Sequence, residues 1–329
     1  MRATPNTVGG VFSPTFHLRR PIVLAAVSVL MLFVGAGCDG TGTQRQQEVQ
    51  RKKTTAADEL KTLRQKAERG DATAQHNLGA IYHKGTSVPQ DYAQAAAWYR
   101  KAAEQGHASA QYDLGVMYRN GEGVPQDDAQ AVAWYRKAAE QGVAQAQCNL
   151  GVMYDDGKGV PQDDAQAVAW YRKAAEQGDV RAQFNLGAMY DSGKGIPQDY
   201  AQAGAWYHKA AEQGYARAQH NLSAMYANGQ GVTHDYAQAA AWARKAAEQV
   251  YARAQYHLGA MYANGQGVPQ DYIESHKWLN LAASRKSGEK QKEYGAMRDD
   301  VAKRMTPAQI AEAQKRAREW LAAFEKREK

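Results

Sequence analysis

Apolar and polar positions along the chain recur with a period of 36 residues. One position of each unit holds tryptophan and another holds leucine: Trp98, Trp134, Trp170, Trp206, Trp242 and Trp278, with Leu78, Leu114, Leu150, Leu186, Leu222 and Leu258. A fixed period of this length is typical of solenoids and repeat arrays. The register runs without insertion from Gly70 to about Arg285, so the pattern predicts six consecutive copies of one structural unit.

Each unit contains two amphipathic segments. In the third copy, apolar residues of the first segment lie at i, i+4, i+7 and i+8: Ala146, Leu150, Met153 and Tyr154. Those of the second segment lie at i, i+3, i+4 and i+7: Ala167, Trp170, Tyr171 and Ala174. Both spacings place the apolar side chains on one face of a helix. Because no strand pattern of comparable length is present, the sequence predicts an all-α solenoid with two helices per repeat.

Turn residues between the segments support two helices per unit. Gly157 follows the first segment, at the position where a left-handed glycine ends a helix. Asp163 with Gln166 forms a capping-box pattern just after Pro161, which predicts the start of the second helix. Gly178 then ends that helix and leads into the next unit.

Both ends of the array contain a candidate capping helix, which a solenoid needs to cover its terminal apolar faces. The first aligns with a second helix but has Thr62 in place of the tryptophan. The last begins with a capping-box pattern at Thr306 and Gln309. The sequence thus predicts an N-terminal capping helix, six repeats and C-terminal capping helices over residues 56–69, 70–285 and 286–329.

The repeated pattern Ala-x-Ala-Gln-x-Asn-Leu-Gly-x-Met-Tyr, Gly-x-Gly-Val-Pro-Gln-Asp and Ala-x-x-Trp-Tyr-Arg-Lys-Ala-Ala-Glu-Gln-Gly resembles the Sel1-like repeat, a relative of the tetratricopeptide repeat. The resemblance covers roughly residues 56–320. It implies a right-handed α-solenoid that scaffolds contacts between proteins, often in secretion, envelope or signalling systems.

Some copies depart from the pattern: Ser87 replaces a loop glycine, Ser223 the helix glycine, Thr233–His234 a Pro-Gln pair, and Val250 the glycine between two repeats. A β-branched residue in a left-handed conformation costs about 1–2 kcal/mol. We therefore expect the junction at Val250 to be a weak point or to adopt a different turn.

The first 37 residues have the organisation of a secretion signal. Residues 22–34 form a 13-residue apolar run after Arg19 and Arg20. A membrane-spanning helix needs about 20 residues, whereas this length fits a signal-peptide core. Ala36, Gly37 and Cys38 follow and resemble the cleavage site of a bacterial lipoprotein, although Gly35 replaces the aliphatic residue usual there. The alternatives are an ordinary secretory signal and a membrane anchor that is retained.

The lipoprotein resemblance implies lipid attachment at Cys38 and a membrane-anchored chain facing the periplasm. Residues 38–55, rich in Gly, Thr, Gln and Lys, are then a flexible tether. Aspartate directly after the lipidated cysteine is associated with inner-membrane retention in enteric bacteria, so Asp39 favours the inner over the outer membrane.

The formal charge of +7 is a property of the chain ends. Residues 1–37 contribute +3, residues 38–55 contribute +2, and residues 284–329 hold 13 basic and 8 acidic residues. Residues 56–283 hold 21 basic and 24 acidic residues, so the array itself is mildly acidic. A basic balance favours nucleic acid only where it covers the binding domain, and we expect no nucleic-acid partner.

Three positions of the first helix vary among the repeats. They contain Gln145, Arg181, Arg217 and Arg253 in the arginine column; His76, Tyr112, Phe184, His220 and Tyr256 in the aromatic column; and Arg119, Asp155 and Asp191 in a third, mixed column. The three columns lie within an arc of about 80° on the helix. First helices of tetratricopeptide-like solenoids line the concave surface, so these residues form a candidate groove. Alternatively, the aromatic column packs between neighbouring first helices.

Residues that carry chemistry are scarce. No histidine pattern typical of a metal site occurs, and the Gly-x-Gly loops lack the Gly-Lys-Ser/Thr ending of a phosphate loop. Cys148 stands alone in a helix, where a cysteine is usually a small buried hydrophobe. We expect no catalytic residues, no metal and no small-molecule cofactor.

The sequence therefore favours a non-enzymatic scaffold or adaptor at the bacterial cell envelope that binds a protein or peptide in its concave groove. The alternative is an envelope enzyme or cell-wall binder related to β-lactams or peptidoglycan. A passive structural spacer is a third interpretation.

Overall fold

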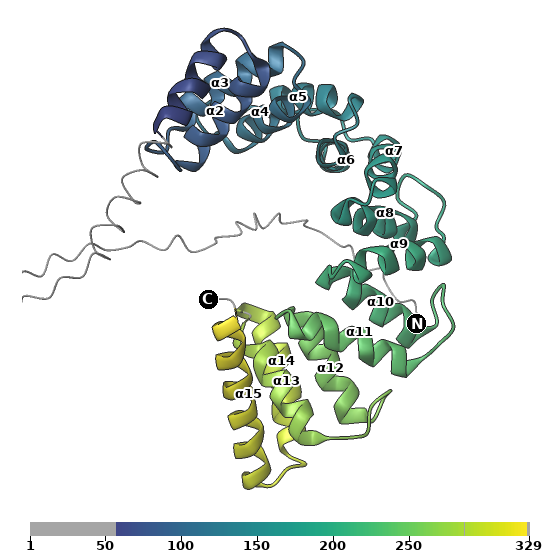
Figure 1. Ribbon diagram of the computed structural model, residues 1–329. Coiled ribbons are helices and arrows are strands. Elements are labelled where there is room, and N and C mark those ends of the chain that lie inside the picture. The colour runs from purple at the N-terminus through teal and green to yellow at the C-terminus, as the bar shows by residue number, and fades with distance from the viewer. Residues whose placement is uncertain (1–56, 286, 328–329) are drawn as a thin grey trace, which may run out of the picture.

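The structure is a computed structural model that describes residues 57–285 and 287–327. Within these ranges it contains helices and no strand, and successive helix pairs pack in tandem into an open arc (Figure 1). The first helices of the six repeats are α2 (Ala72–Lys84), α4 (Ala108–Asn120), α6 (Ala144–Asp156), α8 (Val180–Ser192), α10 (Ala216–Asn228) and α12 (Ala252–Asn264). The second helices are α3 (Tyr92–Glu104), α5 (Asp128–Glu140), α7 (Asp164–Glu176), α9 (Tyr200–Glu212), α11 (Tyr236–Glu248) and α13 (Tyr272–Ser284). The predicted all-α solenoid is confirmed.

The helix ends lie where the turn residues predicted them. Gly157 ends α6 in a left-handed conformation, with φ 66°. Asp163 begins α7, and its carboxylate accepts a hydrogen bond of 2.9 Å from the amide of Gln166. Gly178 follows α7 with φ 89°. The glycine after the first helix and the aspartate before the second recur in every copy, and the junction glycine in the first four, so the length of each helix is set by the sequence of its own repeat.

A glycine of the first helix packs against a tyrosine of the second helix. A Cβ atom at Gly151 would lie 2.7 Å from the ring of Tyr171, so only glycine fits there. The fifth repeat has Ala243 in place of the tyrosine, which leaves room for Ser223. The Ser223 hydroxyl donates a 2.7 Å hydrogen bond to the Ala239 carbonyl. The departure at Ser223 is therefore matched by a second change in the helix that it contacts.

Buried glutamines connect the helices of successive repeats. Gln147 donates to the carbonyl of Ala139 in the preceding second helix and accepts a 2.7 Å hydrogen bond from Gln177 of its own repeat. The same pair of bonds recurs from Gln75 to Gln219. In the last repeat, Arg285 replaces the glutamine that donates this bond in the other repeats. The buried side-chain oxygen of Gln255 has no hydrogen-bond partner among the described residues.

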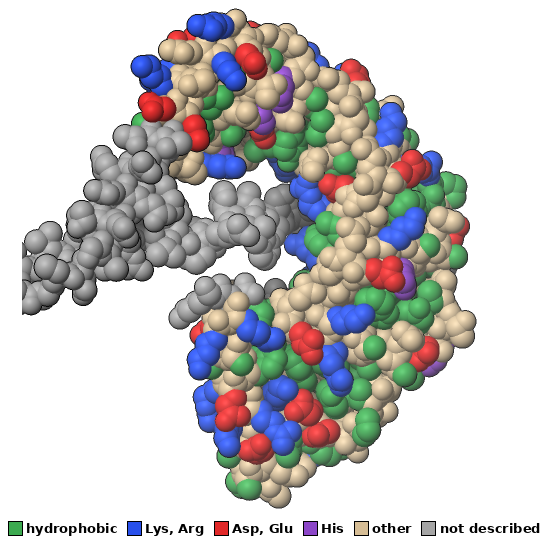
Figure 2. Space-filling model, viewed as in Figure 1, with side chains coloured by type: hydrophobic (Ala, Val, Ile, Leu, Met, Phe, Trp, Pro, Cys, Tyr) green, Lys and Arg blue, Asp and Glu red, His purple; other side chains and the backbone are tan. Residues whose placement is uncertain are grey.

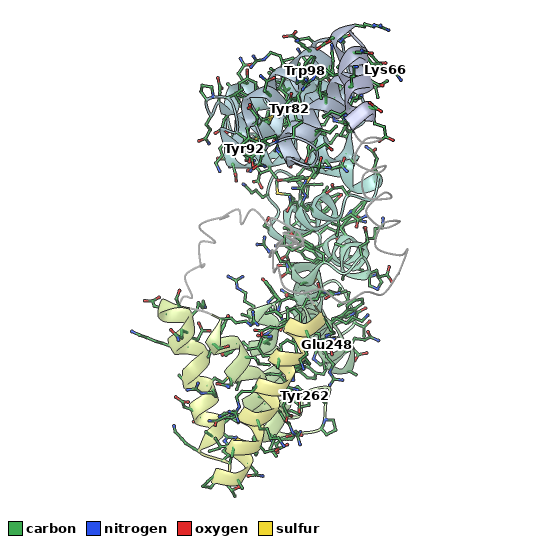
Figure 3. All side chains as sticks on the ribbon, turned by 60° about the vertical axis from the view of Figure 1, so that its left-hand side comes forward. Lys66, Tyr82, Tyr92, Trp98, Glu248 and Tyr262 are labelled. Atoms are coloured by element: carbon green, nitrogen blue, oxygen red, sulfur yellow. The ribbon has the colours of Figure 1, made fainter. Side chains whose placement is uncertain are left out.

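The outer helices carry a second set of repeated contacts. Arginines of second helices donate to tyrosines of the following first helix, as Arg100 does to Tyr118 at 2.8 Å and Arg244 does to Tyr262. Tyr82 and Tyr262 mark the two ends of this series in Figure 3. Trp170 packs against the core of the preceding repeat, and the Lys173 ammonium lies 4.1 Å from its ring centroid.

Helices cover both ends of the array. The helix over residues 57–68 places Leu60 and Leu63 against Leu78 of the first repeat, while Thr62 is exposed. At the other end, α14 (Gly288–Ala302) and α15 (Pro307–Arg327) pack against α13. The capping box predicted at Thr306 and Gln309 is confirmed by reciprocal bonds of 2.8 and 3.3 Å.

Tyr294 of α14 stacks on Tyr256 of α12 with ring centroids 4.5 Å apart. Trp320 of α15 lies edge-on to Trp278 at 5.4 Å. Both C-terminal helices pack on α13, so together they cover the last repeat.

The junction at Val250 retains the turn that its glycine counterparts adopt. Among the described residues, Val250 is the one non-glycine residue with positive φ, at 66°. The amides of Val250 and Tyr251 donate to Ala247 and Ala246 at 3.0 and 3.2 Å, as the corresponding amides do at Gly214. Of the two outcomes expected for this junction, the structure has the strained left-handed turn and not a new one.

The signal sequence, Cys38 and the tether lie outside the described residues. In the described part of the chain, no helix has the length and apolar character to span a membrane.

Candidate functional site

The first helices form the inner side of the arc, with α2 and α6 inside α3 and α7 (Figure 1). Lys and Arg side chains gather along the middle of this inner edge (Figure 2). The face of each first helix that does not contact its partner helix therefore lines a concave groove. The three variable columns of the sequence analysis lie on or beside this face.

The aromatic column packs between consecutive first helices. The ring of Phe184 lies 5.6 Å from Tyr207 of its own repeat and 5.2 Å from Tyr215 at the start of the next first helix. His220 makes an equivalent edge-on contact with Tyr251 at 5.4 Å. His76, Tyr112 and Tyr256 are likewise half-buried. The column thus forms the floor between repeats, and only its edges reach the groove.

The arginine column is more open. Arg181 and Arg253 are exposed, Arg217 is half-buried, and Gln145 is exposed one repeat before them. The guanidinium of Arg181 donates a 3.2 Å hydrogen bond to the buried Asn149 of the preceding repeat. This bond directs the arginine back along the groove, so that its charge lies above the junction between two repeats.

The third column consists of residues that face other helices or loops of the array. The carboxylate of Asp155 forms an ion pair with Lys194 of the next repeat. Asp191 accepts a 3.5 Å hydrogen bond from the Tyr207 hydroxyl, and burial raises the pKa of its carboxyl group. Arg119 is half-buried and its charge acts on the Tyr135 hydroxyl, whose pKa burial raises to about 12. Asp155 thus joins two repeats, and Asp191 joins the two helices of its own repeat.

The residue that precedes each first helix was not singled out from the sequence, although it borders the groove. It is Asp71, His107, Val143, Asp179, Tyr215 or Tyr251 in successive repeats. Asp71, His107 and Asp179 accept a hydrogen bond from the helix N-terminus, whereas the last two tyrosines do not. The signal that would have revealed this column is its variation, which equals that of the arginine column.

Two residues of types that catalysis can use, Cys148 and His76, lie on the first helices. Cys148 is buried, and desolvation raises the pKa of its thiol to about 12, which keeps the thiol protonated and unreactive. His76 lies 2.8 Å from Asp113 and stacks on His107, so its contacts join two repeats. In the described ranges, no group of three or more His, Cys, Asp or Glu side chains is arranged to hold a metal ion.

Six consecutive segments of the chain match the Sel1 repeat: residues 72–107, 108–143, 144–179, 180–215, 216–251 and 252–287. The chain belongs to the Sel1 repeat family. Sel1 repeat proteins generally mediate interactions between proteins, and they are typically non-enzymatic scaffolds. No curated protein sequence matches this Sel1 repeat protein.

Two solved Sel1 structures are similar over most of the array. The first is c5321, a protective antigen present in uropathogenic Escherichia coli strains, with 44% identity over 79% of this chain and a TM-score of 0.70. This chain covers 56% of that antigen, so it spans little more than half of its length. The second, a Sel1 repeat protein from Oxalobacter formigenes, has 35% identity, covers 66% of this chain and 89% of its own, and gives a TM-score of 0.61.

Proposed function

We propose that this Sel1 repeat protein is a non-enzymatic adaptor, anchored at the bacterial cell envelope, that binds a protein or peptide in its concave groove. The observation that carries the proposal is the contrast between the two sides of each first helix. The side that packs against the second helix repeats almost without change. The groove side carries arginines, and the edges of aromatic residues, that differ from repeat to repeat. Arginine, tyrosine and tryptophan are the residues enriched at the energetic centres of protein interfaces.

Envelope anchoring rests on the sequence of the first 38 residues: two arginines, an apolar run of signal-peptide length and Cys38 in a lipoprotein-like context. The test is labelling of the protein with a radioactive or alkyne-bearing fatty acid in a bacterial host. Label that is lost in Cys38→Ala, with the protein released from the membrane fraction, supports a periplasm-facing lipoprotein. Equal labelling of both proteins, or none of either, refutes lipid attachment at this cysteine.

Partner binding is tested by crosslinking in the native envelope followed by mass spectrometry. The test variant reverses the three groove charges, as Arg181→Glu, Arg217→Glu and Arg253→Glu. The matched control reverses three charges with the same 36-residue spacing on the outer helices, as Lys137→Glu, Lys173→Glu and Lys209→Glu.

We expect the groove variant to lose crosslinked partners and the control to retain them, with circular dichroism spectra unchanged in both. Identical sets of partners for the groove variant and the wild-type protein would overturn the groove as the binding site. Loss of partners in both variants equally would point to the overall charge of the array instead.

A further inference from the structure

Three arginines in the second half of the groove form no ion pair among the described residues. Arg181, Arg217 and Arg253 come from three consecutive repeats, and none belongs to the ion pairs of the described ranges. Asp179, which is near Arg181, accepts a hydrogen bond of 2.9 Å from the Ala182 amide at the N-terminus of α8. The strip formed by the three arginines is therefore open to an outside anion.

The carboxylates nearest this strip on the first helices already have partners. Asp155 is paired with Lys194, whose ammonium also lies 3.2 Å from Asp164. Asp191 is bonded to the Tyr207 hydroxyl and half-buried. The Asp155 carboxylate is thus turned to Lys194 and the Asp191 carboxylate to its own second helix, and neither forms an ion pair with the arginines.

Tyrosines alternate with the arginines along the strip. Tyr215 and Tyr251 stand at the N-terminal ends of α10 and α12, where Asp71 and Asp179 cap the equivalent helices. Tyrosine is a poor N-cap, and neither side chain makes a capping hydrogen bond. Burial raises the pKa of the Tyr215 hydroxyl, and the charges of Arg217 and Arg181 act on it in the opposite direction. The charges of two arginines from different repeats therefore act on this one tyrosine.

We propose that the concave face of repeats four to six binds an extended acidic peptide segment that presents a carboxylate at about every third residue. This inference rests on the proposed groove function and names the chemistry of its partner. Packed helices lie roughly 8–10 Å apart. A polyproline II segment rises about 3.1 Å per residue with three residues per turn, so every third side chain recurs on one side at about 9 Å. Carboxylates in that register meet one arginine per repeat, with a tyrosine hydroxyl beside each of the last two.

The experiment measures fluorescence anisotropy of labelled peptides with the full chain purified in detergent. The probe is a peptide of about ten residues with glutamate at every third position. The comparison peptides have the same composition with the glutamates in one block, and the same spacing with lysine in place of glutamate. We expect the spaced glutamate peptide to bind at least tenfold more tightly than the block peptide. We also expect its affinity to fall as salt increases.

The variants separate the arginines from the tyrosines. Arg217→Glu should reduce affinity at least tenfold, whereas the matched control Lys209→Glu on α9 should leave it unchanged. Tyr215→Phe and Tyr251→Phe retain the rings that contact Phe184 and His220, and each should reduce affinity severalfold through loss of a hydroxyl donor. A circular dichroism melt of each variant checks that the fold is kept.

Equal binding of the spaced and block peptides overturns the proposed register. Tighter binding of the lysine peptide overturns the acidic class, and so does an Arg217→Glu protein with wild-type affinity. If the peptides fail while envelope crosslinks still map to the groove, the adaptor function stands and this inference is wrong. If both fail, the groove itself is not the binding site.

Discussion

Replacing Val250 with glycine should stabilise the array, because Val250 adopts a conformation that favours glycine. Its φ of 66° lies in the left-handed region, and the five equivalent glycines have φ between 86° and 96°. The left-handed conformation costs a residue with a Cβ atom about 1–2 kcal/mol. Glycine also gives the unfolded chain more conformational entropy, which lowers the stability by about 0.4–1 kcal/mol and offsets part of the gain. We therefore expect Val250→Gly to gain about 1 kcal/mol.

The assay is thermal unfolding followed by circular dichroism, where this gain raises the Tm by about 2–4 °C for an array of this size. The matched control is Gly214→Val in the preceding junction, where an added Cβ would meet no atom within 4 Å. Its cost is therefore purely conformational, and its Tm should fall. A Val250→Gly protein that melts at or below the wild-type temperature, beside a Gly214→Val protein that melts normally, would refute the argument from backbone conformation.

Three further substitutions test contacts that the structure defines. Burial beside His257 and Arg253 lowers the pKa of His220 to about 4, so its stabilising contribution is full above pH 6.5 and is lost as the pH falls through 4. The wild-type protein should therefore lose up to about 3 kcal/mol of unfolding free energy between pH 6.5 and pH 4, measured by urea titration. His220→Phe, which introduces the residue found at this position in the preceding repeat, should not show this loss. An equal dependence of the unfolding free energy on pH in both proteins would contradict this. Arg285→Gln should supply the donor that Gln255 lacks and raise the unfolding free energy by about 1 kcal/mol, and an unchanged urea midpoint would rule the bond out. Gly187→Ser places a Cβ 2.8 Å from the Tyr207 ring and should cost about 1–3 kcal/mol in the same assay. That cost should vanish in a Tyr207→Ala background, and an equal cost in both backgrounds would exclude the clash as its cause.

The candidate groove residues were only partly predictable from the sequence. Variation among repeats identified Arg181, Arg217 and Arg253, because exposed positions are free to differ where packed ones are not. The same comparison did not decide whether the aromatic column lines the groove or packs between neighbouring first helices. The contacts of Phe184 with Tyr207 and Tyr215 place that column between the repeats. Periodicity along one helix does not say how far the next helix lies from it.

The sequence by itself determined the unit: two helices, their first and last residues, the number of copies and the helices that cover both ends. These features follow from contacts within a few residues, such as the bond from the Gln166 amide to Asp163, whose counterpart begins the second helix of each repeat. Only the tertiary structure decided which residues share a surface. The partner of Asp155 is 39 residues away, and Arg181 reaches Asn149 across 32. Such contacts depend on how each repeat packs on its neighbours. In this packing Asp155 and Asp191 contact Lys194 and Tyr207, whereas the three arginines form no ion pair among the described residues.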